Sequence, residues 1–122
     1  MCVNGSAGLL DIKWHLLSIV FEGAAVDDVE EAGADITLGS DNKAFGRGGC
    51  NQFFGDYKLE GDGIRIGPLA STLMYCEKTM AVEDAFFKAM AVVRKLHSEE
   101  DAMEMWSEDG ATTLLFRKGM HQ

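Results

Sequence analysis

Glycine recurs between short runs of β-branched and aromatic residues along most of this chain. Fourteen of its 122 residues are glycine, and many of them stand beside Asp, Asn or Ser, which also tolerate the backbone of tight turns. Short apolar segments bounded by such residues are typical of β-strands joined by hairpins. The spacing therefore favours a single, mainly β domain.

Strand patterns occupy residues 14–23, 34–49, 53–69 and 102–119. The last three are predicted hairpins that reverse at 39–42, 61–63 and 109–110, where Gly and Asn permit positive φ angles. We expect a type I′ turn at 109–110. Pro68 donates no backbone hydrogen bond, so it is expected to mark the end of a strand or a sheet edge. One face of the last hairpin is predicted to consist of Met103, Met105, Leu114 and Phe116.

One helix is predicted over residues 80–97. Its apolar stripe recurs at steps of three and four residues and consists of Val82, Phe86, Ala89, Met90, Val93 and Leu96. Thr79 is placed to cap the N-terminus, Glu83 lies early, and the basic residues of 94–97 lie late, which suits the helix dipole. Strands around one amphipathic helix predict an α+β, mainly antiparallel domain.

The charge balance is acidic. Twenty Asp and Glu stand against eleven Lys and Arg, for a net charge of −9, which argues against nucleic acid or an anionic membrane as a partner. Residues 22–35 and 99–109 each hold six acids and no Lys or Arg. These blocks are expected to be solvated loops, and docking of a basic protein partner is the alternative.

The location and assembly of the chain are also predicted from its composition. No stretch approaches the ~20 apolar residues of a membrane span, and the N-terminus lacks the basic region of a secretory signal. We therefore expect a cytoplasmic monomer without a transmembrane segment. Extracytoplasmic location is the alternative if a leader has been removed.

The three cysteines, Cys2, Cys50 and Cys76, match no CxxC-type zinc pattern. A thiol nucleophile would need His15 or His97 within hydrogen-bond reach, but these lie in a strand and a helix pattern far apart in the sequence. The run GRGGCNQ has neither a P-loop spacing nor a following helix that would hold phosphate. The sequence therefore predicts no enzyme activity, no metal and no cofactor.

Seven large side chains admit two interpretations: Trp14, Phe53, Phe54, Tyr57, Met74, Tyr75 and Trp106. The simpler interpretation is that most of them belong to the hydrophobic core. The alternative is that they line an apolar pocket, because a small β-barrel holds one ligand when side chains leave its interior open. The second interpretation makes the protein a carrier of a small apolar ligand.

A longer motif covers residues 46–90, GRGGCNQFFGDYKLEGDGIRIGPLASTLMYCEKTMAVEDAFFKAM. Its Gly-Gly-Cys-Asn run, Gly-x-Tyr, IGPLAST-x-M-x-C segment and helix with Glu83 and Phe87 resemble the META domain family, also called HslJ-like. The resemblance extends from Trp14 to the closing strand at 114–116, as one META domain over 12–118 after a short extension, 1–11. The candidate structural and binding signature is Gly48, Gly49, Cys50, Asn51, Gly55, Tyr57, Pro68, Thr72, Met74 and Cys76.

The resemblance implies a strongly curved antiparallel sheet or small lipocalin-like barrel with one packed helix, and no catalysis. Members include a bacterial heat-shock protein and trypanosomatid proteins linked to infectivity, secretion and motility. The implied function is binding in stress response, secretion, motility or virulence. The family's paired cysteines correspond to Cys50 and Cys76, which we expect to be free thiols in the cytoplasm. Gly49→Val is predicted to be more damaging than Cys50→Ser, because the glycine supplies backbone geometry forbidden to a β-branched residue and the thiol supplies only packing.

Overall fold

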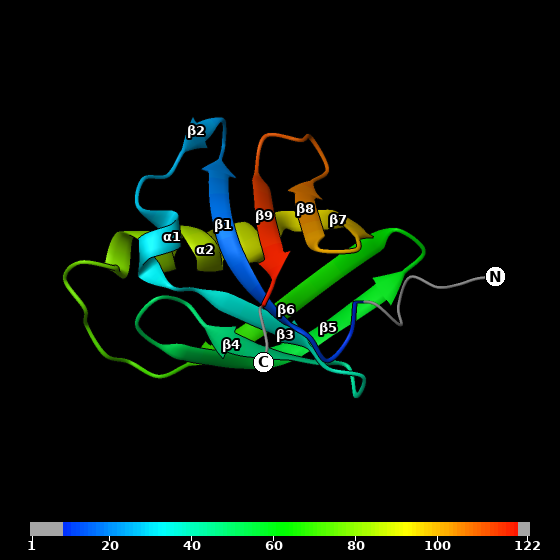
Figure 1. Ribbon diagram of the computed structural model, residues 1–122, viewed down its shortest axis with the longest axis horizontal. Coiled ribbons are helices and arrows are strands. Elements are labelled where there is room, and N and C mark those ends of the chain that lie inside the picture. Colours follow the sequence, from blue (N-terminus) through cyan, green and yellow to red (C-terminus); the bar gives the residue numbers. More distant parts are fainter. Residues whose placement is uncertain (1–8, 120–122) are drawn as a thin grey trace.

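The computed structural model describes residues 9–119, which contain nine antiparallel strands and two short helices (Figure 1). The elements in chain order are β1 (Lys13–Phe21), β2 (Ala24–Ala25), α1 (Val29–Ala32), β3 (Asp35–Leu38), β4 (Lys43–Arg47), β5 (Gln52–Glu60), β6 (Gly63–Ser71), α2 (Met80–Val92), β7 (Val93–Glu99), β8 (Ala102–Ser107) and β9 (Thr113–Lys118). The spatial order is β2-β1-β3-β4-β5-β6-β7-β8-β9, and β1 also pairs with β9, which closes eight strands into a barrel. The predicted mainly β fold is confirmed. Residues 1–8 of the expected N-terminal extension, 1–11, lie outside the described part of the chain.

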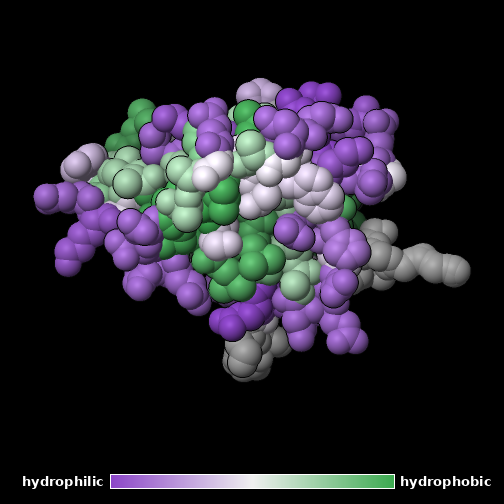
Figure 2. Space-filling view, turned by 90° about the horizontal axis from the view of Figure 1, so that it is seen from above, coloured by the Kyte–Doolittle hydropathy of each residue, from purple (hydrophilic) through white to green (hydrophobic). Residues whose placement is uncertain are grey.

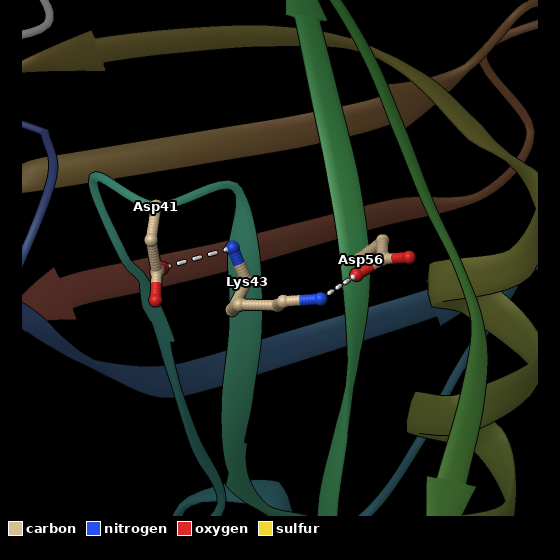
Figure 3. Close-up of polar contacts among 3 residues, drawn as sticks. All are labelled: Asp41, Lys43 and Asp56. Atoms are coloured by element: carbon tan, nitrogen blue, oxygen red, sulfur yellow. Dashed lines mark hydrogen bonds and ion pairs between the residues drawn. The ribbon is translucent and has the colours of Figure 1, made fainter.

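The predicted reversals at 39–42 and 61–63 are confirmed, because β3 pairs with β4 and β5 pairs with β6 across them. In the first turn, Asp41 Oδ1 accepts a hydrogen bond from the backbone N–H of Lys43 at 3.2 Å. The Lys43 ammonium in turn lies 2.7 Å from Asp56 Oδ1 on β5 (Figure 3). Both side chains of that ion pair are exposed, so the pair contributes little to stability.

The β8–β9 hairpin is confirmed, but the two-residue type I′ turn is wrong. Residues 108–112 connect the strands, and the Ser107 N–H donates to the Thr112 carbonyl at 2.9 Å. Only Gly110 in this loop has a positive φ, 75°, whereas a type I′ turn needs two. Asp109 instead accepts the Ser107 hydroxyl at 2.7 Å, which stabilises the longer loop.

Helix α2 is shorter than predicted, and β7 begins without a loop. The helix ends at Val92, and Val93 is already extended with ψ 146°. Residues 93–99 pair with β8, where Leu96 lies opposite Met105. The β-branched pair at 92–93 and this strand pairing outweigh the helical periodicity. The basic residues of 94–97 are therefore strand residues. The Arg94 guanidinium still donates to the Ala91 carbonyl in the last turn of α2, at 3.1 Å, as the predicted interaction with the helix end requires. Lys95 and His97 pair instead with Asp62 and Glu99.

Thr79 stands at the N-cap position of α2 but makes no capping hydrogen bond. Its Oγ1 is buried and has no hydrogen-bond partner among residues 9–119. Backbone contacts replace the predicted cap, because the Thr79 and Met80 N–H groups both donate to the Cys76 carbonyl, at 3.1 and 3.0 Å.

Side chains from α2 reach into the barrel. The Phe86 ring lies 5.9 Å from Phe53 of β5 and 6.1 Å from Phe116 of β9, measured between ring centroids. The Phe53–Phe86 pair is edge-to-face, with an interplanar angle of 84°, a contact that stabilises by about 0.5–1.5 kcal/mol beyond area burial. The largest fully buried side chains are Trp14, Ile19, Ile36, Leu38, Phe53, Phe86, Met90, Val93, Met103, Met105, Leu114 and Phe116. The helix therefore completes the core. The predicted common face of the last hairpin, Met103, Met105, Leu114 and Phe116, is buried in it.

Pro68 was expected to mark either the end of a strand or a sheet edge. It does not end β6. The strand continues to Ser71, and its register against β5 shifts between Gly55↔Leu69 and Tyr57↔Ile66. Two β6 residues, Gly67 and Pro68, thus stand opposite one β5 residue, and the bond between them is cis. The described pairing of β6 with β7 is limited to Gly63, so Pro68 lies where β6 is a local sheet edge.

Candidate functional site

The GGCN run forms the turn between β4 and β5. The Gly48 N–H donates to the Asn51 carbonyl at 2.8 Å. Gly49 has φ 120°, a conformation that side chains with a Cβ rarely adopt. A Cβ on Gly48 would lie 2.8 Å from the Phe87 ring of α2. The two glycines therefore permit both the backbone of the turn and its close approach to the helix.

Asn51 joins this turn to the segment after β6. Its side-chain Oδ1 accepts the Thr72 hydroxyl at 2.8 Å and the Met74 N–H at 2.6 Å. Its Nδ2 donates to the Met74 carbonyl at 3.0 Å. The Thr72 Oγ1 also accepts the Gln52 N–H at 3.1 Å. One amide side chain thereby fixes the backbone of residues 72–74.

Glu83 of α2 accepts hydrogen bonds from the same turn. This side chain is 3% exposed. Its Oε1 accepts the N–H groups of Cys50 at 2.9 Å and Asn51 at 2.6 Å, and its Oε2 accepts Asn51 Nδ2 at 2.7 Å. Three N–H groups thus replace the water that a buried carboxylate loses. Its position in the first turn of α2 adds the favourable helix dipole.

Glu83 was expected from the sequence as an early acid of the helix and as part of the family motif, but its contact with the turn was not predicted. A signal for this role was present in the apolar neighbours Val82 and Phe86, which place an acid between them near the buried face of the helix. An acid at such a position needs hydrogen-bond donors. The amide-rich GGCN turn supplies them.

A disulfide joins Cys50 to Cys76, with 5.8 Å between their Cα atoms. The expectation of free thiols is therefore wrong. The family resemblance identified the right pair, and the expectation failed because it assumed a reducing compartment. The two cysteines are 26 residues apart and meet when β6 returns to the start of β5. The assumption that Cys50 supplies packing alone is also wrong, so the predicted ranking of Gly49→Val over Cys50→Ser loses its basis. Breaking the disulfide has a cost of its own.

Between Asn51's contacts and the disulfide, the chain exposes three consecutive large apolar side chains. The side chains of Leu73, Met74 and Tyr75 are 95%, 56% and 77% exposed. We call residues 73–75 the apolar loop. It projects at one end of the barrel, beside the start of α2 (Figure 1). Figure 2 shows that hydrophobic residues also gather in the middle of the face seen from above, within a hydrophilic border.

The remaining signature residues lie in other parts of the barrel. Gly55 faces Pro68, since a Cβ on Gly55 would lie 2.6 Å from the Pro68 carbonyl oxygen. Tyr57 is buried, and its hydroxyl donates to the Gly39 carbonyl in the β3–β4 turn. Burial, followed by the nearby charges of Asp11 and Asp41, raises the pKa of the Tyr57 phenol. The structure therefore brings together Gly48, Gly49, Cys50, Asn51, Thr72, Met74 and Cys76, but not Gly55, Tyr57 and Pro68.

The aromatic candidates divide between core and surface rather than lining one pocket. Trp14, Phe53 and Tyr57 are buried in the core. Phe54 and Tyr75 are exposed.

Within residues 9–119, no group of three or more His, Cys, Asp and Glu is placed to hold a metal ion. No helix in this part of the chain is long and apolar enough to cross a membrane.

These features define a small closed β-barrel completed by one helix, with a disulfide-clamped apolar loop. The family model of the META domain matches residues 7–120, and the chain belongs to the META domain family. No curated protein matches it.

Solved structures share the fold. A protein from Burkholderia xenovorans, solved by NMR, is similar over 97% of this chain and 90% of its own, with 22% identity and a TM-score of 0.72. A DUF4847 family protein from Bacteroides vulgatus is similar over 98% of this chain and 100% of its own, with 12% identity and a TM-score of 0.69. At these identities the likeness concerns the fold alone.

Proposed function

We propose that this META-domain protein is a non-catalytic binding protein that contacts a protein partner through the apolar loop. The observation that carries the proposal is the combination of exposure and fixed backbone at residues 73–75. Three consecutive large apolar side chains are exposed to solvent. Hydrogen bonds from Asn51 and the Cys50–Cys76 disulfide fix the backbone that carries them. A loop fixed in its bound conformation loses little entropy on association, which favours affinity.

The acidic chain supports a partner whose contact surface is apolar with a basic border. The net charge of −9 would steer such a surface towards the protein and away from nucleic acid. We further propose that the free protein is a monomer. Stress response, secretion, motility and virulence remain the proposed settings.

The disulfide bears on the proposed location. Disulfides persist in oxidising compartments and are rare in the cytosol, so the Cys50–Cys76 bond favours the extracytoplasmic alternative. We propose that the protein acts in such a compartment.

The alternative of a carrier with an apolar interior finds little support. A cavity large enough for a ligand would leave accessible surface on the side chains that line it. Trp14, Phe86, Met90, Met103 and Phe116, which point into the barrel, have none. The helix and strand side chains described here fill the interior in place of a ligand.

The test is affinity capture by a Leu73→Ser/Tyr75→Ser variant and by the wild-type protein, followed by calorimetric titration of each purified captured protein. We expect the double variant to weaken the specific partner by at least about tenfold, since exposed anchors of this size each contribute more than about 1 kcal/mol at a binding centre. Val92→Thr, which alters an exposed apolar residue on α2, is the matched control and should bind normally. Equal binding by wild type, double variant and control would refute the role of the apolar loop.

A further inference from the structure

The outer surface of the barrel carries a groove that the proposed function does not use. It has a volume of about 480 Å³ and runs across β1, β3, β4 and β5. Its lining includes Lys13, Asp35, Phe45, Arg47, Gln52 and Phe54. The volume lies within the ~300–1,000 Å³ range of small-molecule sites.

Strand register places two kinds of side chain in neighbouring rows. Phe45 of β4 lies directly opposite Phe54 of β5, and Thr37 connects Phe45 to Lys13 across β3 and β1. The two phenyl rings form an apolar floor that remains 46% and 61% exposed. Aromatic pairs of this size are normally buried in a core or covered by a partner.

The adjacent row is charged and predominantly basic. Arg47 lies between Asp35 and Gln52 in the register of β3, β4 and β5. Within residues 9–119 no salt bridge is recorded for Arg47 or Lys13. Among the described residues that line the groove, Asp35 is the one acid. Two cations therefore face one carboxylate there, in a chain whose net charge is −9.

We propose that this groove binds a small organic anion, with its apolar ring or chain over Phe45 and Phe54 and its carboxylate or sulfonate group against Lys13 and Arg47. The guanidinium of Arg47 suits a bidentate contact with a planar carboxylate. A single lining carboxylate makes a poor cation site. The overall negative charge disfavours a nucleic acid on the same surface.

The test uses 8-anilinonaphthalene-1-sulfonate, an aromatic anion that fluoresces when bound, and N-phenyl-1-naphthylamine, which lacks the sulfonate. Titrations follow fluorescence and backbone amide shifts, and 2-naphthoate serves as a carboxylate competitor. We expect shifts in β3, β4 and β5, displacement by 2-naphthoate, and weaker binding of the uncharged amine. Arg47→Gln and Phe54→Ser should each weaken the sulfonate by at least about fivefold.

Two further variants make the outcome decisive. Asp35→Asn removes the one negative charge of the groove and should tighten the anion, which a merely structural change would not do. Arg65→Gln, on the exposed face of β6, is the matched control and should have no effect. Equal affinity for the sulfonate and the uncharged amine, insensitivity to Arg47→Gln, or amide shifts confined to other strands would overturn the proposal. If Phe54→Ser does not fold, the two charge variants still decide the question.

Discussion

The backbone and side-chain amides of Asn51 both donate to the carboxylate of Glu83, at 2.6 and 2.7 Å. A residue of the β4–β5 turn and a residue of α2 are thereby joined twice, 32 positions apart in the chain. The same Asn51 side chain then fixes the apolar loop. The helix, the turn and the loop form one hydrogen-bonded unit.

Glu83→Gln is predicted to destabilise the protein by about 2–3 kcal/mol. The new carboxamide turns one N–H₂ group towards either Asn51 Nδ2 or the two backbone N–H donors, so a donor faces a donor. Urea unfolding measures the loss. Asp84→Asn, at the neighbouring exposed acid that pairs with Lys88, should change stability by no more than about 0.5 kcal/mol. Similar small losses for both variants would contradict the role of Glu83.

The Cys50→Ala/Cys76→Ala variant is predicted to lose about 2–4 kcal/mol, because the disulfide restricts the unfolded chain over a 26-residue separation. Amide hydrogen exchange at residues 72–76 should accelerate as well. Adding dithiothreitol should destabilise the wild type and leave the variant unchanged. An intact Cys50–Cys76 bond leaves one free thiol, that of Cys2. Three free thiols detected in unreduced, denatured wild-type protein would refute the pairing.

Tyr57→Phe should lower the free energy of unfolding by about 1 kcal/mol. The Gly39 carbonyl keeps its hydrogen bond from the Asn42 N–H but loses the buried phenol. Thermal unfolding measures the difference. Asp56→Asn, which removes the exposed Lys43 ion pair, supplies the comparison and is expected to cost no more than about 0.5 kcal/mol. A larger cost at Asp56 than at Tyr57 would reverse this account.

Ionisation of Asp35 is predicted to lower the free energy of unfolding as the pH rises above 3.8. Burial raises the pKa of this carboxyl above its ordinary value of 3.8, although Lys13, His15 and Arg47 oppose the shift. The folded state therefore binds the proton more tightly than the unfolded state. The stabilisation from Asp35 is present below pH 3.8 and is lost as pH rises through the raised pKa.

Urea unfolding of wild type and Asp35→Asn between pH 3.5 and about pH 7 checks this prediction. The stability of the wild type relative to the variant should be greatest at the acidic end and should decline towards neutrality. Taking the difference removes the contribution of the other acids. A difference that stays constant or grows with pH would show that the sign is wrong.

Local patterns were sufficient to predict the hairpins, because Gly39 and Asn42 in one turn and Gly61 and Gly63 in the other permit few alternatives to a reversal. They failed where tertiary pairing decided the conformation. Residues 93–97 continue a helical periodicity, yet β8 draws them into the barrel. Seven residues of the predicted signature do lie close together, but the sequence did not predict which of them contact one another. Neither the disulfide nor the coordination of the turn by Glu83 follows from local sequence, since each joins residues more than 25 positions apart.

The Cys50–Cys76 disulfide also makes the β5–β6 hairpin part of a closed covalent ring. The reversal at 61–63 is an exposed loop tip within that ring and is open to a protease. A single cut there would leave the two halves of the chain joined through sulfur. The nicked protein would gain only the mass of one water and would stay in one piece until a reductant separated the halves. The apolar loop would stay tethered to the turn that positions it.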